Sequence, residues 1–317
     1  MTITLARSHS IYDIDAVQTA QTRAKAQQSA ELDAFYENML SLGSERFITT
    51  PSSNEALDPL YEDCPNFGEV LDDMARYLGL ALAGGSSINV MPVLLLGDPG
   101  VGKTHFGKRL ANAFATEFEF ISMNALSAGF VITGSSSSWK GAKCGKVAER
   151  LVRGKYANPV VLLDEVEKAT GSTQSDPMAA LYQLLEPETS RNFHDEFIDV
   201  DLDASQVFWI LTANSLDGIP APLLSRMAVY EVPSPTAEQA AGIGQRIYIG
   251  LLRELKLANL DTELGGAVLD KLADISPREM RKALLDGLGF AVAAGRTALV
   301  AEDLRVKADG GKRKIGF

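Results

Sequence analysis

The sequence is poor in the residues that build disulfide frameworks and metal centres. It has only two cysteines, Cys64 and Cys144, which lie far apart and lack the spacing of metal ligands. This usage favours two unpaired thiols in a reducing compartment. The three histidine side chains form neither a metal-ligand pattern nor a catalytic triad, so we expect ordinary surface or helix residues at His9, His105 and His194.

Long apolar runs and an excess of positive charge are missing too. No uninterrupted apolar run reaches the roughly 18 residues that a membrane span needs, and residues 1–10 lack the apolar core of a signal peptide. We therefore expect a soluble cytoplasmic protein with no membrane partner. The net charge of -11 argues against a large nucleic-acid surface, so nucleic acid is not an expected partner.

What the sequence does contain is a phosphate-loop pattern. Residues 97–104 have the form G-x-x-x-x-G-K-[ST], between an apolar run at Val93–Leu96 and a helical pattern at Phe106–Phe114. Glycines let backbone N–H groups face a phosphate, Lys103 adds a cation, and Thr104 offers a hydroxyl to Mg²⁺. The alternative is a glycine-rich turn that binds nothing. The residues expected to contact ATP are Asp98, Pro99, Gly100, Val101, Gly102, Lys103, Thr104 and His105.

A second pattern ends the apolar run Leu162-Leu163 with the acidic pair Asp164-Glu165. Two carboxylates at the end of a buried strand are costly unless positive charge lies nearby. Asp164 fits a Mg²⁺ ligand alongside Thr104, and Glu165 is placed to polarise the attacking water. The alternative is a strand end that meets solvent.

Apolar runs alternate with helical patterns through the middle of the chain, which predicts an α/β fold with a parallel sheet flanked by helices. Because Phe118–Ile121 lies between the two motifs, we expect a strand inserted between the two nucleotide-binding strands. The predicted strands are 93–96, 118–121, 159–163, 207–211 and 229–232.

The ends of the chain differ from this middle, and 317 residues are enough for two or three domains. Ile14–Leu42 predicts one long helix or a helix pair, packed on another subunit or a substrate, or merely solvated. Thr49–Asp58 has the composition of a linker. Three helical patterns follow Pro235. We expect an N-terminal helical segment with its linker at 1–58, a nucleotide-binding α/β domain at 59–235 and a small helical lid domain at 236–317.

Taken together, these motifs resemble the AAA+ ATPases, and most closely the ATPase module of the Lon protease. The resemblance covers roughly residues 60–317. Its implications are binding and hydrolysis of ATP with Mg²⁺ and assembly into a homo-oligomeric ring, a hexamer by family expectation. The segments that carry it are 97–104, 162–168, 175–177, 184–188, 192–193, 210–214 and 219–227.

The resemblance also implies roles for single residues. Asn214 matches the sensor-1 amide that positions the attacking water, with a strand-end cap as the alternative. Arg226 matches the arginine finger, which acts on the γ-phosphate of a neighbouring subunit, with a surface salt bridge as the alternative. Arg278 and Arg281 are both candidates for the sensor-2 arginine, and Arg281 is favoured because residues 281–284 resemble the sensor helix of related proteins.

In the same comparison, Trp139 and Lys140 match the aromatic pore loop of Lon-like enzymes, inside a Ser- and Gly-rich stretch at Ala125–Gly145 that predicts a loop. Such a loop grips an extended polypeptide without reading its sequence. A Trp packed on its own domain is the alternative. The adenine is expected near Asn66–Gly68.

These observations favour a ring-forming ATPase that unfolds, remodels or disassembles an unknown protein client. Intrinsic proteolysis is not expected, because the sequence has no segment matching the serine–lysine dyad of Lon and Ser135–Ser138 has no positioned acid or base. The alternatives are a nucleic-acid-associated AAA+ ATPase of the loader or mobile-element type, and a nucleotide-dependent switch or scaffold. Glu165, Asn214 and Arg226 argue against an inactive ATPase.

Overall fold

The computed structural model describes residues 4–124, 128–169 and 176–305 of the protein. The chain divides into two compact units, each made of segments that are separate in sequence. The first contains Met1–Leu60, Glu69–Gly97 and Lys103–Glu231. The second contains Tyr61–Gly68, Asp98–Gly102 and Val232–Phe317. The last part of the predicted lid domain, 306–317, lies outside the described residues.

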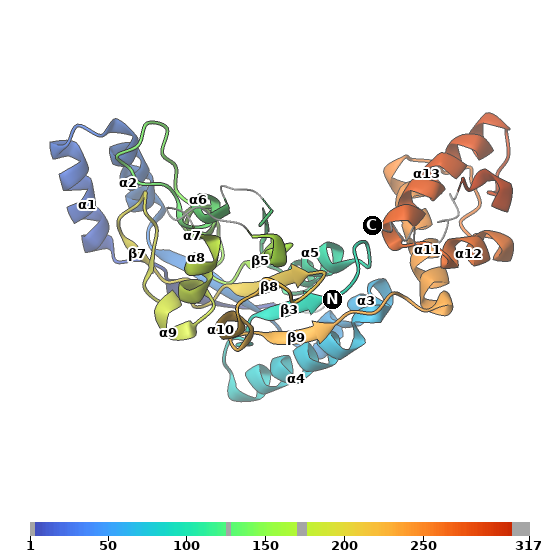
Figure 1. Ribbon diagram of the computed structural model, residues 1–317, viewed down its shortest axis with the longest axis horizontal. Helices are drawn as coiled ribbons and strands as arrows, with labels where there is room; N and C mark the ends of the chain where they lie inside the picture. Colours follow the sequence, from blue (N-terminus) through green and yellow to red (C-terminus); the bar gives the residue numbers. More distant parts are fainter. Residues whose placement is uncertain (1–3, 125–127, 170–175, 306–317) are drawn as a thin grey trace, which may run out of the picture. The chain divides into compact units, whose positions relative to one another are not determined.

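A five-stranded parallel sheet forms the centre of the first unit (Figure 1). Its strands are rich in Val, Ile and Leu, as expected of strands that are covered on both faces. The predicted α/β fold is confirmed. In spatial order the strands are β4 (Phe118–Ser122), β5 (Val160–Asp164), β8 (Phe208–Ala213), β3 (Val93–Leu96) and β9 (Ala228–Glu231).

The order of the strands corrects one detail of the sequence analysis. A strand does separate the two nucleotide-binding strands β3 and β5, but it is β8 and not the segment Phe118–Ile121. That segment forms β4, which lies at the edge of the sheet beside β5. Position between two motifs in sequence therefore did not give position between them in space.

The two faces of the sheet are covered by different helices. Val161 and Leu163 of β5 face the large core, which includes side chains of α1 (Ile14–Ala26), α2 (Ala30–Leu42), α7 (Lys146–Arg153) and α8 (Pro177–Leu184). Leu162 faces the other side, where α5 (Lys103–Ala113) approaches so closely that a β-carbon on Gly107 would lie 2.7 Å from Cδ1 of Leu162. Glycine at this position lets the helix that follows the phosphate loop lie directly on the sheet.

None of the helices in the described residues is long and apolar enough to cross a membrane. The α-helices of the first unit range from 4 to 17 residues in length. They are α1 (Ile14–Ala26), α2 (Ala30–Leu42), α4 (Gly68–Gly84), α5 (Lys103–Ala113), α6 (Ala128–Thr133), α7 (Lys146–Arg153), α8 (Pro177–Leu184), α9 (Pro187–Ser190) and α10 (Ala221–Leu224), with short 3₁₀ helices at Asn54–Ala56 and Val166–Lys168.

The N-terminal helices pack on their own chain, which corrects the prediction that they cover another subunit or stay solvated. Val17 and Met39 are fully buried in the core shared with the sheet. The hydroxyl of Tyr36 donates a hydrogen bond to the backbone oxygen of Ile198. The helix-pair alternative is the one that the structure shows, with α2 ending at Gly43.

The predicted linker at Thr49–Asp58 is also wrong at its start, because β2 (Glu45–Pro51) runs through it and pairs antiparallel with β1 (Thr4–Ser10). Thr49 and Thr50 are buried, and the side chain of Asn158 bonds both the N–H and the C=O of Thr49, at 3.0 and 2.8 Å. A Thr- and Ser-rich composition did not distinguish this strand from a loop.

A second short antiparallel pair joins β6 (Phe193–His194) to β7 (Asp201–Leu202).

The second unit is a small helical bundle with its own core around Tyr248, Leu272 and Met280. Two of its helices begin with a reciprocal capping box, formed by Thr236 with Gln239 and by Ser276 with Glu279. Its elements are α3 (Asp58–Asp63, at the boundary), a 3₁₀ turn at Pro65–Phe67, α11 (Ala237–Glu254), α12 (Gly266–Ala273), α13 (Pro277–Ala293) and a 3₁₀ turn at Ala301–Asp303.

Candidate nucleotide-binding and hydrolysis site

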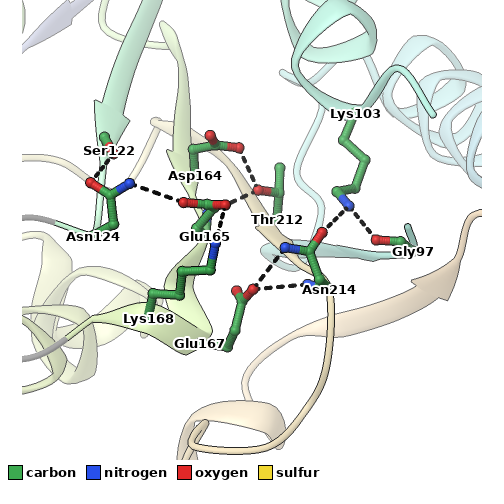
Figure 2. Close-up of polar contacts among 10 residues, drawn as sticks. All are labelled: Gly97, Lys103, Ser122, Asn124, Asp164, Glu165, Glu167, Lys168, Thr212 and Asn214. Carbon is green, nitrogen blue, oxygen red and sulfur yellow. Dashed lines mark hydrogen bonds and ion pairs between the residues drawn. The ribbon is translucent and has the colours of Figure 1, made fainter. Parts of the chain in front are cut away.

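Polar side chains from three adjacent strands meet at the carboxyl edge of the sheet (Figure 2). Because β5, β8 and β3 are parallel neighbours, their carboxyl ends lie side by side, which is where open α/β sheets bind ligands. The structure brings together four of the residues predicted from sequence, namely Lys103, Asp164, Glu165 and Asn214.

Lys103 begins α5 and is only 8% exposed. Its ammonium group donates hydrogen bonds to the backbone oxygen of Gly97 and, at 3.0 Å, to Oδ1 of Asn214. These two hydrogen bonds hold the ammonium group at the carboxyl end of β3. Lys103 is therefore suited to a phosphate group at the start of the helix.

Asp164, at the end of β5, is held by the neighbouring strand. The hydroxyl of Thr212 on β8 donates to Oδ1 of Asp164 at 2.7 Å and accepts from the backbone N–H of Glu165 at 3.1 Å. One threonine thus fixes the direction of both acidic residues. Within the described residues, the second oxygen of Asp164 makes no hydrogen bond.

Glu165 follows in a left-handed backbone conformation, with φ at 58°. Such a conformation is unfavourable for a residue with a side chain and is concentrated at functional sites. The carboxylate accepts hydrogen bonds from Lys168 and, at 3.0 Å, from Nδ2 of Asn124. The bond from Lys168, more than the one from Asn124, lowers the pKa of Glu165, so this carboxyl group stays ionised at neutral pH.

Asn214 is oriented by an acidic residue that the sequence analysis did not single out. Oε1 of Glu167 accepts from the backbone N–H of Asn214 at 3.2 Å and from its Nδ2 at 3.0 Å. This contact turns the amide oxygen toward Lys103. Oε2 of Glu167 is buried and has no hydrogen-bond partner in the described part of the chain.

The phosphate loop requires glycine at two positions. Gly100 and Gly102 have φ of 89° and 109°, values that residues with side chains rarely adopt. Within the second unit, a β-carbon on Gly100 would lie 3.3 Å from Oγ of Ser276 and 3.8 Å from Cβ of Arg278. Val101 is buried, whereas the other predicted contact residues are partly or fully exposed: Asp98, Pro99, Thr104 and His105.

The two candidate sensor-2 arginines lie in different surroundings. Arg278 is in the first turn of α13, beside Gly100 of the loop. Arg281 is one turn further on, where it donates to Oε2 of Glu254 at 2.8 Å in an exposed ion pair. Of the two arginines, Arg278 is the one that lies next to Gly100 of the phosphate loop within the second unit.

Arg226 is held within its own protomer. Its Nε donates to Oε2 of Glu186 at 2.7 Å, and its Nη1 donates to the backbone oxygen of Pro222 at 2.7 Å. The guanidinium carbon lies 5.4 Å from the ring centre of Tyr182. The structure is therefore compatible with both interpretations of Arg226. It forms a surface salt bridge, and its side chain is 30% exposed, as an arginine finger requires.

The stretch predicted as a loop around Trp139 and Lys140 contains a helix, α6, so the prediction of an uninterrupted loop at Ala125–Gly145 is wrong there. Residues 125–127 of this stretch lie outside the described residues. Trp139 is 49% exposed and packs edge to face on Phe130 of α6, with ring centres 5.4 Å apart. Lys140 is exposed.

A buried carboxylate closes the base of this loop. Asp195 accepts from the backbone N–H groups of Gly145, Phe197 and Ile198 at 2.7, 3.0 and 3.1 Å and is fully buried. Burial raises its pKa to about 6, against the lowering effect of the three donors. The tip of the loop is thus open to solvent while its two ends are anchored.

The residues present fit ATP with Mg²⁺. The glycines at 100 and 102 leave the space that a side chain would fill, and Lys103 supplies the positive charge that phosphates require. Thr104 and the second oxygen of Asp164 are hard oxygen donors, and Mg²⁺ in nucleotide sites takes few such protein ligands and completes its shell with water and phosphate. Asn66, which the sequence analysis placed near the adenine, donates to the backbone oxygens of Val101 and Pro233 at 3.2 and 3.0 Å.

Several residues of the site carried no signal in a single sequence. Thr212, Glu167 and Asn124 act through contacts between segments that lie 41 to 48 residues apart in the chain. Glu167 and Lys168 directly follow the acidic pair, and an acidic–basic dipeptide after a strand is the one local hint of their role. Asp195 had none.

Residues 93–233 match the family "ATPase family associated with various cellular activities (AAA)". The chain is 34% identical over 227 residues to a mitochondrial Lon protease homolog of Emericella nidulans, which covers 71% of this chain and 20% of the relative. It is 34% identical over 244 residues to Lon protease 2 of Sorangium cellulosum, covering 73% and 29%.

A third relative, the Lon protease of Clostridium beijerinckii, is 40% identical over 172 residues, covering 54% of this chain and 22% of the relative. The matches therefore span between a fifth and three tenths of the length of these relatives. The family match at residues 93–233 includes the sheet and the polar cluster at its carboxyl edge. This part of the chain is therefore an ATPase domain of the AAA family, and it is similar to the ATPase module of Lon proteases.

Proposed function

We propose that this protein hydrolyses ATP within a homo-oligomeric ring, a hexamer by family expectation, and uses the energy to unfold, remodel or disassemble a protein client. The observation that carries the proposal is the polar cluster that sets Lys103, Asp164, Glu165 and Asn214 at adjacent strand ends. A cation, a metal-binding carboxylate, a second carboxylate and an amide are the groups that phosphoryl transfer to water uses.

Each residue has a distinct part in this reaction. Lys103 binds the outer phosphates and stabilises the negative charge on them. Mg²⁺, bound with Thr104 and Asp164 as protein ligands, neutralises further phosphate charge. Glu165 is a weak base because its pKa is low, so its part is to orient and polarise the attacking water. Asn214, fixed by Glu167, supplies an oriented amide beside Lys103.

We assign the arginine finger to Arg226, acting on ATP that is bound by the next protomer. A cation supplied across an interface stabilises charge on the transferred phosphoryl group and makes hydrolysis depend on assembly. The partly exposed side chain supports this assignment. For sensor 2 we now assign Arg278 in preference to Arg281, because Arg278 is beside the phosphate loop and Arg281 is paired with Glu254.

We assign client contact to Trp139 and Lys140. A half-exposed Trp on an anchored loop presents a large apolar surface to an extended chain. We assign no peptide-bond cleavage to the described residues, because the hydroxyls of Ser136 and Ser138 contact each other and that of Ser135 accepts from the backbone of Lys143. The cytoplasm is the compartment we propose.

The central test compares the wild type with Glu165→Gln. The variant keeps the size of the side chain and the bond from Asn124 but loses the charge, so ATP should still bind while phosphate release falls by about 100-fold or more. Binding is measured by calorimetry and turnover by phosphate release, with the exposed Glu263→Gln as the matched control. Near-normal turnover in Glu165→Gln would overturn the assignment.

The same variant addresses the client. A form that binds ATP without cleaving it should hold a client, so Glu165→Gln with ATP is used as bait for an unfolded model protein. Retention that depends on ATP and is lost in Glu165→Gln combined with Trp139→Ala supports action on protein. Retention of single-stranded DNA in its place would favour the nucleic-acid alternative.

A further inference from the structure

The guanidinium group of Arg226 is fixed on three sides by three different elements. Glu186, directly before α9, accepts from Nε at 2.7 Å. Pro222 of α10 accepts from Nη1 through its backbone oxygen at 2.7 Å. Tyr182 of α8 lies against the guanidinium, 5.4 Å from ring centre to Cζ. A long side chain that would otherwise sample many rotamers is therefore held in one position.

The contacts leave one part of the group open. In the part of the chain that the structure describes, Nη2 of Arg226 has no hydrogen-bond partner. Glu186 takes Nε alone, whereas a carboxylate that blocked the group would take two nitrogens in the fork geometry of a bidentate pair. The protomer thus fixes the cation while keeping a donor available.

In the described residues, the side chain of Glu186 forms a hydrogen bond and ion pair with Arg226 and no other hydrogen bond. It makes no capping bond to α9, and the other bonds to Glu186 involve its backbone oxygen, which accepts from Thr189 and Ser190. Its side chain is 38% exposed, so no buried charge would be left unpaired by its removal. Folding therefore does not account for a carboxylate at this position.

We propose that Glu186 and Tyr182 are positioning residues for Arg226, which hold its guanidinium so that Nη2 faces the phosphate of ATP on the neighbouring protomer. The inference rests on the proposed function, in which Arg226 acts across an interface. Fixing the cation before assembly removes the entropy cost of ordering it during the reaction, and a displacement of about 1 Å can lower a rate by 100-fold. The opposite role, a latch that withholds Arg226, is an outcome of the test.

The test uses full-length protein with ATP and compares Glu186→Ala, Glu186→Gln and Tyr182→Leu. Glu186→Ala should lower kcat at least about tenfold with little change in KM for ATP, because the variant protomer still binds its own nucleotide. Glu186→Gln should retain most of the turnover, since its amide oxygen still accepts from Nε. Tyr182→Leu should give a smaller loss. The matched control is Glu188→Ala, an exposed carboxylate on the next helix.

A double-mutant cycle separates positioning from a general structural effect. Arg226→Ala combined with Glu186→Ala should turn over no more slowly than Arg226→Ala alone, because Glu186 acts only through Arg226. Losses that multiply, turnover that rises in Glu186→Ala, or a fall in thermal stability that explains the loss would each overturn the inference.

The same variants also separate failure of the positioning role from failure of the arginine-finger assignment on which it rests. If Arg226→Ala turns over normally, the finger assignment itself is wrong. If Arg226→Ala is inactive and depresses wild-type subunits in mixtures while Glu186→Ala is normal, only the positioning role fails.

Discussion

The carboxyl edge of the sheet and the loop around Trp139 handle charge in opposite ways. At the sheet edge, Lys103 is bonded to Asn214 and Glu165 to Lys168, so charged groups lie close together near the surface. At the Trp139 loop a buried carboxylate, that of Asp195, is at the base, and the tip carries an exposed aromatic ring.

This difference matches two kinds of ligand. A network of fixed charges stabilises a triphosphate and a developing charge, because the groups are already oriented. An aromatic surface on an anchored loop contacts many sequences, because packing on a ring does not depend on a specific donor or acceptor. We therefore expect activity at the sheet edge to change when a single atom is changed. We expect activity of the Trp139 loop to depend on whether an aromatic ring is present.

The largest effect should follow from removing the cation of the sheet edge. Lys103→Ala should weaken ATP binding by at least about 100-fold, because the phosphates lose a charge-assisted contact in a partly buried site. Calorimetric titration measures it, and Lys108→Ala, an exposed lysine on the same helix, is the control. Unchanged affinity in Lys103→Ala would place the nucleotide elsewhere.

Removing the carboxylate at the base of the loop should be the next largest effect, on folding. Asp195→Ala leaves three backbone N–H groups without an acceptor and should lower the free energy of unfolding by about 3 kcal/mol or more. Chemical denaturation measures the change. Asp201→Ala, whose carboxylate is 61% exposed, should change it by less than about 1 kcal/mol.

The same carboxylate gives the loop region a pH dependence. Because burial raises the pKa of Asp195 to about 6 from 3.8, the folded state binds its proton more tightly than the unfolded state. Its contribution to stability is full below pH 3.8 and is lost as the pH rises through about 6. Relative to Asp195→Asn, the wild type should gain about 2 to 3 kcal/mol between pH 7.5 and pH 4. A constant difference would contradict the raised pKa.

Trp139→Ala should have little effect on folding but a clear effect on the client. A half-exposed ring contributes about 1 kcal/mol at most to unfolding through its contact with Phe130. Client-stimulated ATP hydrolysis should be lost, and Trp139→Phe should restore part of it. Full stimulation in Trp139→Ala would remove Trp139 from client contact.

The smallest effect is expected at Asn124. Asn124→Ala removes one of the two bonds to Glu165 while the stronger one, from Lys168, remains. Turnover should change less than about tenfold, since each neutral hydrogen bond contributes about 1 kcal/mol. Steady-state phosphate release measures it, with Asn54→Ala, an asparagine in a distant 3₁₀ turn, as the control. A loss as large as that in Glu165→Gln would show that the base depends on Asn124.

The sequence allowed the phosphate loop and the acidic pair to be predicted because each is a local pattern. Lys103 and Asp164 stand in fixed registers beside an apolar run, so strand, turn and helix follow from spacing. The position of β8 between β3 and β5 did not follow, because strand order is set by the packing of segments that are far apart in the chain.

Packing also explains the other differences. The helices at 14–42 have weak amphipathic patterns, yet Tyr36 and Met39 complete a core whose other side chains come from distant segments. Thr49 sits in a strand because Asn158 satisfies its backbone, a contact that no local composition indicates. Arg278 and Arg281 are three residues apart on one helix, and only the position of Gly100 distinguishes them.

The base of the Trp139 loop also has a practical consequence for engineering. A β-carbon on Gly134 would lie 2.8 Å from Asp195, and one on Gly145 would lie 2.1 Å from the backbone oxygen of Ile132, so neither glycine tolerates substitution. A β-carbon on Gly141, between them, would meet nothing within 4 Å, but its φ of 80° still favours glycine. Changes to this loop are therefore best confined to the exposed residues 137–140, with the three glycines kept.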